Sequence, residues 1–337
     1  MGRHRHADQL AIVKKPPVIY MTSATKPDTE KENIPTNNLQ WGAAALFNEY
    51  MSAVNPAMPQ ITIEAFDSSL HETGNTRIIP LDLSHALKTN YPATTPNLMA
   101  NFVRICAGEM IVTSAKASSE MFYVIRGTGT SETEWGITEW SAGDVFVIPA
   151  TESARHKAIS DAAFYWVNDA PVLGYLGAVP VRATFSPVFF SHERIMSELE
   201  RVRKDPEASS RNRIGVLFSN PACPLTKTLT PTLWSLYCVL PAGTVQLPHR
   251  HNSVALDYCV LTGSDTYTLV GREIDENGRI VDPVKAVWTT GSVFITPPGL
   301  WHSHHNESGE DAYVLPIQDA GLVTQMRILD IQFVAAN

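Results

Sequence analysis

Cysteine is scarce in this chain of 337 residues, and its four cysteines are scattered. None of them form the C-x-x-C pairs that are typical of zinc and redox motifs. Cys106, Cys238 and Cys259 lie in apolar, strand-like runs, where a free cysteine packs as a small hydrophobic side chain. We therefore expect free thiols and a reducing, cytoplasmic location. A disulfide between Cys238 and Cys259 is the alternative.

Long apolar runs and an excess of positive charge are also missing. No stretch approaches the roughly 18 consecutive apolar residues that a membrane-spanning helix requires. The start, Met1 to His6, leads into polar sequence without the apolar core of a signal peptide. With 26 Lys and Arg against 34 Asp and Glu the net charge is -8, which argues against nucleic acid as a partner. The composition, 44% hydrophobic and 18% charged, indicates a globular protein with room for two domains.

Short apolar runs separated by turn residues fill most of the remaining sequence. Four such runs lie between residues 94 and 185 without a long helix, and the pattern resumes at residue 233 and continues to about residue 333. Many short strands at this spacing predict an all-β sandwich or barrel. Residues 192–202, between the two regions, carry apolar side chains at helical intervals after Ser191, a residue type that caps helices. We expect a short linker helix there.

Five of the eleven histidines fall within two short runs near the end of the chain. His249 and His251 are separated by one residue, so on a strand both imidazoles point to the same face. His302 follows a Pro-Pro-Gly turn after a β-rich run, and a neighbouring strand could bring it to the same point. Three neutral imidazoles that converge make a transition-metal site with open coordination positions. Packed or surface histidines are the alternative.

The residues around these histidines resemble the two sequence motifs of the cupin superfamily. The second family motif, G(X)5PXG(X)2H(X)3N, matches at every fixed position, which are Gly291, Pro297, Gly299, His302 and Asn306. The first motif, G(X)5HXH(X)3-4E(X)6G, matches at Gly243, His249, His251 and Gly263. Ala255 and Leu256 stand at its glutamate positions, and Asp257 comes directly after them.

The first half of the chain repeats this motif pattern without the histidines. Its first motif keeps Gly108, Glu120 and Gly127 in register, while Ser114 and Lys116 occupy the two histidine positions. Its second motif keeps Gly143 and Pro149, but His156 is displaced from the position of the third ligand. A lysine ammonium at a ligand position repels a metal cation. The first barrel is therefore predicted to be a degenerate, metal-free partner.

The resemblance and the repeat together define the expected architecture. We expect an all-β fold of two tandem cupin barrels, each a double-stranded β-helix or jelly roll. An N-terminal arm with packing segments would occupy 1–93, the degenerate barrel 94–185, a linker with the short helix 186–225, and the metal-binding barrel 226–337.

Within the cupins, His249-Arg250-His251 and the run from Thr296 to His304 resemble the gentisate 1,2-dioxygenase group. The resemblance implies Fe(II) held by His249, His251 and His302, with His304 contacting the substrate. Ser303 replaces an aspartate of the family pattern. Asp257 stands where the family has an arginine for the substrate carboxylate, and the family's working site lies in its N-terminal barrel rather than its C-terminal one.

Several roles stay open for the residues near the histidines. His304 could accept a phenolic proton, donate one, or form a supporting hydrogen bond. Asp257 could be a fourth ligand, orient a ligand or substrate group, or cap a turn at the barrel rim. Trp301 could wall the substrate pocket or pack in the core. Because a carboxylate repels a substrate carboxylate, we expect a neutral or cationic substrate, or another carboxylate partner such as Arg250.

The favoured function is a metal-dependent, Fe(II) dioxygenase that cleaves an aromatic or small oxygenated substrate with O2. The alternatives are a cupin lyase, decarboxylase or isomerase that uses Mn, Ni or Zn as a Lewis acid, another metal-dependent hydrolytic or oxidative enzyme, and a non-catalytic ligand-binding bicupin. Three imidazoles alone do not select the metal. We expect a small-molecule substrate, a homo-oligomer (dimer or tetramer), and neither nucleic acid nor membrane as a partner.

Overall fold

A computed structural model describes residues 41–54 and 57–334 of the chain. Contacts divide the chain after Ala57 into two units. The first unit contains a 3-10 turn, η1 (Tyr50–Val54), whose side chains are exposed. The expected N-terminal arm up to residue 40 lies outside the described residues. The second unit begins at Met58 and contains the strands and the candidate site described below.

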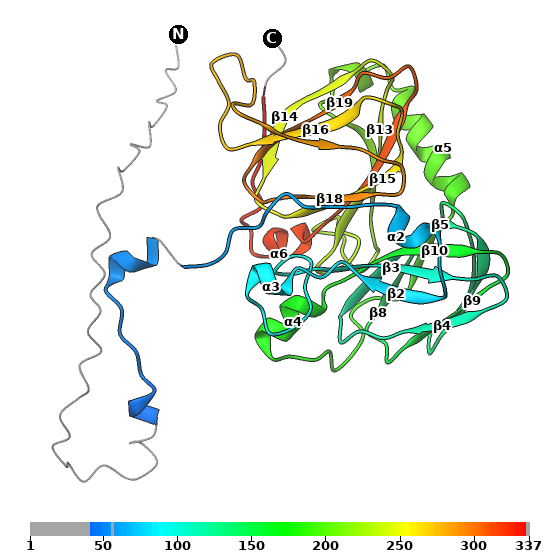
Figure 1. The fold of residues 1–337 in the computed structure, drawn as a ribbon, viewed down its shortest axis with the longest axis horizontal. Coiled ribbons are helices and arrows are strands. Elements are labelled where there is room, and N and C mark those ends of the chain that lie inside the picture. Colours follow the sequence, from blue (N-terminus) through cyan, green and yellow to red (C-terminus); the bar gives the residue numbers. More distant parts are fainter. Residues whose placement is uncertain (1–40, 55–56, 335–337) are drawn as a thin grey trace. The chain divides into compact units, whose positions relative to one another are not determined.

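The second unit consists of two similar halves, each made of two antiparallel sheets (Figure 1). In the first half, a six-stranded sheet has the order β11-β8-β5-β10-β3-β2 and a four-stranded sheet has the order β4-β9-β6-β7. Their strands are β2 (Arg77–Pro80), β3 (Met99–Ile105), β4 (Met110–Thr113), β5 (Ser119–Arg126), β6 (Thr128–Thr133), β7 (Gly136–Ser141), β8 (Val145–Pro149), β9 (Ala154–Ala158), β10 (Ala162–Asn168) and β11 (Val188–Phe190).

The second half repeats this plan with one more strand. Its six-stranded sheet has the order β1-β18-β15-β20-β13-β12, and its five-stranded sheet has the order β17-β16-β19-β14-β21. Their strands are β1 (Ala65–Phe66), β12 (Ile214–Phe218), β13 (Trp234–Leu240), β14 (Val245–His251), β15 (Ala255–Leu261), β16 (Thr266–Gly271), β17 (Val284–Val287), β18 (Val293–Thr296), β19 (Trp301–Asn306), β20 (Ala312–Gln318) and β21 (Ile331–Phe333).

Short helices connect the sheets: α2 (Ser69–Glu72), α3 (Ser84–Leu87), α4 (Ala170–Leu176), η2 (Ala208–Ser210) and α6 (Ala320–Gln325). The longest described helix, α5 (His192–Arg203), confirms the predicted linker helix. The Ser191 hydroxyl accepts a hydrogen bond from the Arg194 backbone N–H at 3.3 Å, which satisfies one of the free amides of the first turn. Ile195 and Leu199, four residues apart, are buried on the face that packs against β12.

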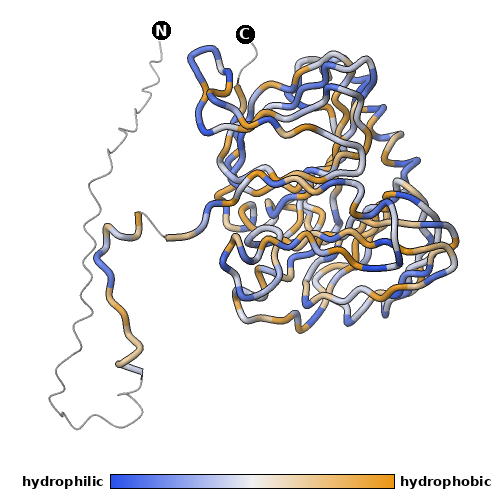
Figure 2. The backbone as a smooth tube through the Cα atoms, in the orientation of Figure 1, coloured by the Kyte–Doolittle hydropathy of each residue, from blue (hydrophilic) through white to orange (hydrophobic). Residues whose placement is uncertain are grey.

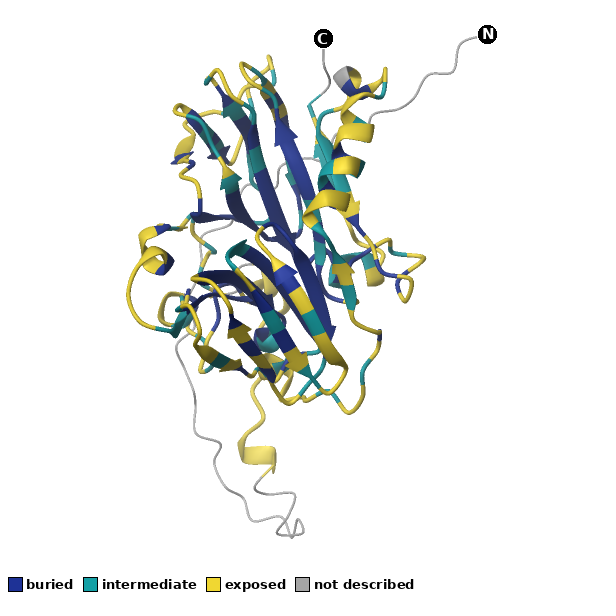
Figure 3. Ribbon diagram, turned by 90° about the vertical axis from the view of Figure 1, so that its right-hand side faces the viewer, coloured by how far each residue is buried: buried dark blue, intermediate teal, exposed yellow. Residues whose placement is uncertain are grey.

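The two six-stranded sheets pack face to face and form the largest core, which joins the two halves. Alternate residues of each strand belong to it, such as Tyr123 and Tyr165 from the first half and Leu256 and Tyr258 from the second. The rings of Tyr165 and Tyr258 are stacked with centroids 5.2 Å apart. Apolar stretches and buried strands gather at this junction (Figures 2 and 3). Each half has a further, smaller core between its own two sheets.

The expected all-β fold of two tandem cupin domains is confirmed, with one difference. Each half is a pair of facing sheets of the jelly-roll type, and the sheets are not joined into a closed barrel by strand pairing among the described residues. All four cysteines are free thiols, as expected. No helix among the described residues is long and apolar enough to cross a membrane.

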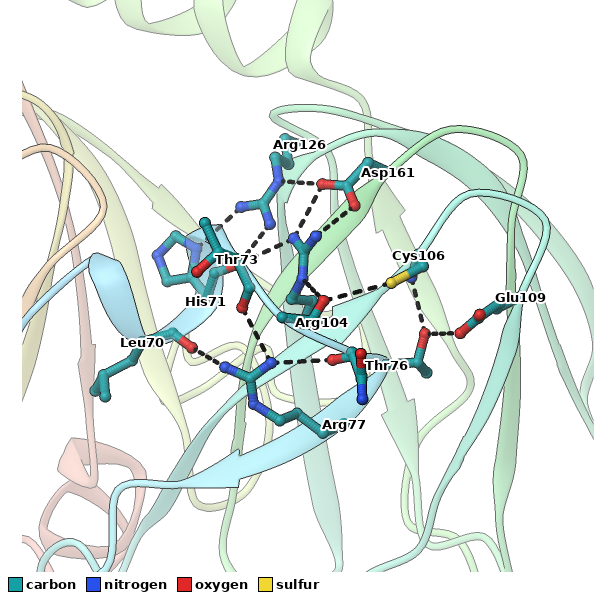
Figure 4. A network of polar contacts seen from close by, with 12 residues as sticks. Leu70, His71, Thr73, Thr76, Arg77, Arg104, Cys106, Glu109, Arg126 and Asp161 are labelled. Carbon is teal, nitrogen blue, oxygen red and sulfur yellow. Dashed lines mark hydrogen bonds and ion pairs between the residues drawn. The ribbon is translucent and has the colours of Figure 1, made fainter.

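The stretch from β1 to β2, which we call the strap, ties the two halves together. β1 pairs with β18 of the second half, and β2 pairs with β3 of the first. Between them, buried His71 lies 3.0 Å from the Gly291 carbonyl through Nε2 and 3.0 Å from Arg126 through Nδ1. A guanidinium only donates, so Nδ1 accepts and Nε2–H donates to Gly291. Asp161 pairs with Arg126 at 3.0 Å and with Arg104 at 2.8 Å (Figure 4).

Candidate metal centre

The histidines lie on two neighbouring antiparallel strands of the five-stranded sheet. β14 carries His249 and His251, and β19 carries His302 and His304. His249 is directly opposite His302. All four side chains are buried on the face that points between the two sheets of the second half.

An irregularity in β14 aims the first two histidines inward. Val245 and Leu247 are exposed and Gln246 is buried, so simple alternation would turn His249 outward with the first two. The register between β14 and β19 shifts by one residue after Gln246, because two residues on β14 face one on β19. Such a bulge suits Pro248, which has no N–H to donate to the ladder. After it, the histidine pair lies on the buried face.

Three of the four histidines form a group that could hold a metal ion. His249, His251 and His302 each offer one ring nitrogen, and these nitrogens lie within 4.8 Å of one another. Among the described residues this is the one group of three or more potential ligands, and Asp257 does not belong to it. The ring centroids of His249 and His302 are 4.0 Å apart, and those of His251 and His302 are 4.8 Å apart.

Backbone carbonyls fix the tautomer of two of these imidazoles. His251 Nδ1 is 2.9 Å from the Ser253 carbonyl, and His302 Nδ1 is 3.0 Å from the Leu300 carbonyl. A carbonyl oxygen only accepts, so each Nδ1 carries the proton and each Nε2 presents its lone pair. A hydrogen bond of this kind from the second ring nitrogen is typical of metal-binding histidines. His249 Nδ1, by contrast, is buried and has no hydrogen-bond partner.

Burial also keeps these rings neutral. It lowers the pKa of His251 to about 4. The pKa values of His249 and His302 are lowered well below the ordinary range, mainly by burial and then by neighbouring histidines. A metal ligand must be unprotonated. Three neutral imidazole donors whose ring nitrogens lie within 4.8 Å of one another therefore fit a borderline transition-metal ion rather than Mg²⁺ or Ca²⁺.

The register explains why a fourth, carboxylate ligand is missing. In the first half Glu120 pairs with Ile148, and the corresponding pair in the second half is Ala255 with Thr296. Ala255 therefore occupies the place of the motif glutamate. Asp257 lies two residues further along β15, buried, and accepts a hydrogen bond from the Thr296 hydroxyl at 2.6 Å. Burial raises the pKa of Asp257 to about 6.

Arg213 enters the same space from the loop before β12, and the sequence analysis did not single it out. Its Nη2 lies 3.2 Å from His249 Nε2 and 3.1 Å from His304 Nε2. Its positive charge also acts on the carboxyl group of Asp257, whose pKa it lowers against the stronger effect of burial. A half-buried guanidinium thus faces the histidine cluster. No local motif marks it, because it reaches the site from a loop 36 residues before His249.

The structure places His304 in this space and Trp301 away from it. His304 Nδ1 is 2.7 Å from the Thr268 hydroxyl, and its ring centroid is 5.8 Å from that of His249. Trp301 lies one residue before His302 on β19, and the Arg250 guanidinium sits 5.1 Å from the centre of its ring. Alternation along the strand puts Trp301 and Arg250 on the opposite face of the sheet from the ligands. Trp301 as a pocket wall and Arg250 as a partner of the substrate carboxylate therefore stay predictions.

The C-terminal strand β21 borders the site. It pairs with β14, and Phe333 is opposite His249. The Phe333 ring is nearly parallel to the His249 imidazole, with centroids 5.9 Å apart. β21 thereby covers the edge of the strand that carries two of the three candidate ligands.

The matching space in the first half has no such group. The residues that correspond to the ligands are Ser114 and Lys116, which are exposed, and Ala154. His156 is opposite Ser131 on β6, as His304 is opposite Thr268 on β16. His156 thus corresponds to His304 and not to the third ligand. It is buried among Phe122, Phe146 and Phe164.

Comparison with known proteins supports this architecture. No family model matches the chain. A segment of 116 residues, 34% of the chain, is 29% identical to 5-aminosalicylate 1,2-dioxygenase from Comamonas sp, and it spans only 30% of that protein. The structure of salicylate 1,2-dioxygenase from Pseudaminobacter salicylatoxidans matches with a TM-score of 0.67 and 14% identity over 90% of this chain and 99% of that one.

The same enzyme in its gentisate adduct matches with a TM-score of 0.66 and 13% identity over 93% of this chain and 97% of that one. These structural matches show the fold. The chain therefore has a tandem cupin fold, with a three-histidine cluster in its second half. In overall arrangement it is similar to salicylate 1,2-dioxygenase.

Proposed function

We propose that this protein is a metal-dependent dioxygenase that cleaves the ring of an aromatic hydroxy acid. The main support is the group of three buried imidazoles. In two of them Nδ1 donates to a backbone carbonyl, which leaves Nε2 free to bind a metal. His249, His251 and His302 would hold the ion, with Fe(II) as the proposed metal. The ion would supply a common binding point for substrate oxygens and O2 and a path for electrons between them.

Arg213 supports an acid as the substrate. A guanidinium matches a carboxylate through two parallel hydrogen bonds. Its present partners are two imidazole nitrogens, which are weaker partners than an ionised carboxylate. Asp257 is engaged by Thr296 and does not neutralise Arg213 through an ion pair. We therefore revise the expectation of a neutral or cationic substrate and assign the carboxylate to Arg213.

The relatives point to the same chemical class. One is named for 5-aminosalicylate, another for salicylate, and the latter has been solved with gentisate. All three compounds are aromatic rings with a hydroxyl group beside a carboxylate. In such a compound the carboxylate would meet Arg213 while the hydroxyl group lies near the candidate metal and His304.

Oxygen consumption by the Fe(II)-loaded protein tests the proposal. Salicylate, gentisate and 5-aminosalicylate should each be offered with the matching methyl ester, which keeps the hydroxyl group but removes the negative charge. We expect oxygen uptake with at least one acid, loss of the aromatic absorbance, and little uptake with its ester. Turnover without oxygen in the presence of Mn, Ni or Zn would instead support the lyase, decarboxylase or isomerase.

We also propose an oligomeric state and a cellular location. The protein would be a homo-oligomer, a dimer or tetramer, and it would work in the cytoplasm. Light scattering coupled to size-exclusion chromatography would test the first, and a single-chain mass of 37.1 kDa would contradict it.

A further inference from the structure

The two halves share a three-residue hydrogen-bonded chain that neither cupin motif includes. In the second half, Trp288 Nε1 donates to the Thr268 hydroxyl at 2.8 Å, and this hydroxyl is 2.7 Å from His304 Nδ1. In the first half, Trp140 Nε1 donates to the Ser131 hydroxyl at 2.9 Å, which is 2.7 Å from His156 Nδ1. All six residues are buried. This hydrogen-bonded trio is therefore a feature of the fold, because it occurs both in the half with the three-histidine cluster and in the half without it.

The halves differ in what the other ring nitrogen meets. His156 Nε2 is 2.9 Å from the Thr113 hydroxyl, which can donate or accept. His304 Nε2 is 3.1 Å from Arg213 Nη2, which can only donate. His304 must therefore accept through Nε2 and carry its proton on Nδ1. The Thr268 oxygen then receives two donors, the indole N–H of Trp288 and the Nδ1–H of His304, which occupy both of its lone pairs.

We infer that Thr268 and Trp288 are positioning residues that hold His304 protonated on Nδ1, so that Nε2 accepts a hydrogen bond from the substrate. The inference rests on the proposed function, since it takes a hydroxylated aromatic acid as the ligand. A carboxylate that takes over the Arg213 guanidinium leaves the Nε2 lone pair free. The hydroxyl group of the same substrate can then donate to it. Of the three roles considered for His304, this arrangement favours the one in which it accepts the phenolic proton of the substrate.

The tautomer can be measured without any turnover. The full-length chain would be labelled with ¹⁵N-histidine and loaded with Zn(II), which is diamagnetic, and the ring nitrogens of His304 assigned by comparison with His304→Gln. We expect a protonated Nδ1 and an unprotonated Nε2. In Arg213→Met, which removes the donor to Nε2, Nδ1 should stay protonated, and the proton should move to Nε2 when Thr268→Val is added, because the valine cannot accept from Nδ1–H. A wild-type His304 protonated on Nε2 would overturn the inference.

Kinetics then separate positioning from stability. In the Fe(II) enzyme, Thr268→Val should lower kcat by about tenfold or more, as expected when a proton-accepting group is misdirected. Thr268→Ser, which keeps the hydroxyl group, should stay within roughly twofold of wild type. Ser131→Ala is the matched control, because it removes the same hydrogen bond in the half without the cluster, and it should leave kcat and KM unchanged.

Two results would contradict the positioning role. One is equal loss of kcat in Thr268→Val and Ser131→Ala, which would indicate a shared structural role. The other is full kcat in Thr268→Val. If Thr268→Val does not fold, Trp288→Phe and the wild-type tautomer still decide the question. An enzyme that consumes no oxygen with any acid would refute the proposed function but leave the tautomer result standing.

Discussion

Arg213 determines the charge of the space between the sheets of the second half. The histidines around it are neutral, because burial lowers the pKa of each well below its ordinary range or, for His251, to about 4. The guanidinium is thus the fixed positive charge that approaches the cluster in the described part of the chain. A site of this kind attracts an anionic ligand and orients it through the two N–H groups of one edge.

Replacing Arg213 should therefore affect substrate binding and spare the metal. Arg213→Met keeps most of the side-chain volume and removes the charge. We expect KM for a carboxylated substrate to rise by roughly ten- to a hundredfold, as a lost charged hydrogen bond of about 1.5–3 kcal/mol predicts, with metal content unchanged. Arg250→Met, on the other face of the sheet, is the control and should leave KM unaltered. Equal KM values in the two variants would remove the assigned role.

His156 gives the first half a measurable dependence on pH. Complete burial lowers its pKa to about 3, from an ordinary value near 6.5. The unfolded chain then binds more protons than the folded one between pH 3 and 6.5. Stability rises with pH across this window and gains nothing from His156 above it. The contribution reaches up to about 1.4 kcal/mol per pH unit.

Urea denaturation between pH 4 and 6.5 tests this prediction. Since other buried histidines contribute to the same slope, the informative quantity is the difference between wild type and His156→Gln. The variant should show a flatter rise of unfolding free energy with pH, even though its stability is lower throughout. Parallel curves would show that His156 does not titrate as its surroundings suggest.

At the scale of elements, a polar network holds the strap together with the packing of Phe66, Ile78 and Ile79 on the apolar cores. Arg126 contacts the ring and the backbone of His71 and also pairs with Asp161 (Figure 4). Its loss leaves a buried imidazole nitrogen without a donor, which costs about 1–3 kcal/mol. Arg155 belongs to the same half but forms only an exposed pair with Glu132 at 3.2 Å, and such pairs contribute about 0–1 kcal/mol.

Arg126→Met should consequently lower the free energy of unfolding by about 1–3 kcal/mol. Arg155→Met is the matched control, and we expect it to change stability by less than about 1 kcal/mol. Both values can be taken from denaturation followed by tryptophan fluorescence. A loss in Arg155→Met as large as in Arg126→Met would show that the network does not hold the strap.

Local pattern was enough to predict the short strands, the helix after Ser191 and the proximity of the three histidines, while the tandem cupin fold followed from the resemblance to the family motifs. These features depend on strand alternation, capping and short motif spacing. The inward direction of His249 also depends on the bulge near Pro248, which alternation alone does not predict. Edge strands β11 and β12, which lie within the stretch expected to be a linker, complete sheets of different halves. Their pairing is decided by tertiary contacts.

The residues that sequence reasoning missed share one property: they reach the site from distant segments. Arg213 arrives from a loop. Thr268 comes from β16, which pairs with β19, and Trp288 directly follows β17, which pairs with β16. Trp301, by contrast, adjoins a candidate ligand on β19, and neighbouring residues on a strand face opposite sides. Its role in the substrate pocket stays a prediction. The division at residues 94, 186 and 226 stays a prediction.

At the scale of the molecule, one fold is used twice with different content. The first half fills the space between its sheets with aromatic rings around His156, including Phe122, Phe146 and Phe164. The second half places imidazoles and Arg213 in the corresponding space. The first half therefore shares the core of the six-stranded sheets with the second half, and its own interior is stabilised by the packing of these aromatic rings.

This asymmetry predicts a metal content near one ion per chain. Elemental analysis of the protein loaded anaerobically with Fe(II) should give about one equivalent, and His249→Ala, His251→Ala or His302→Ala should each reduce it to a small fraction, because two imidazoles hold the ion weakly. The variants should stay folded, since three apolar cores and not the metal hold the sheets. His305→Ala is the control: its ring is half-buried against Tyr267, with centroids 4.8 Å apart, and it should retain the ion. A native content near two, with one ion left in each ligand variant, would place a second site in the first half and refute its degenerate character.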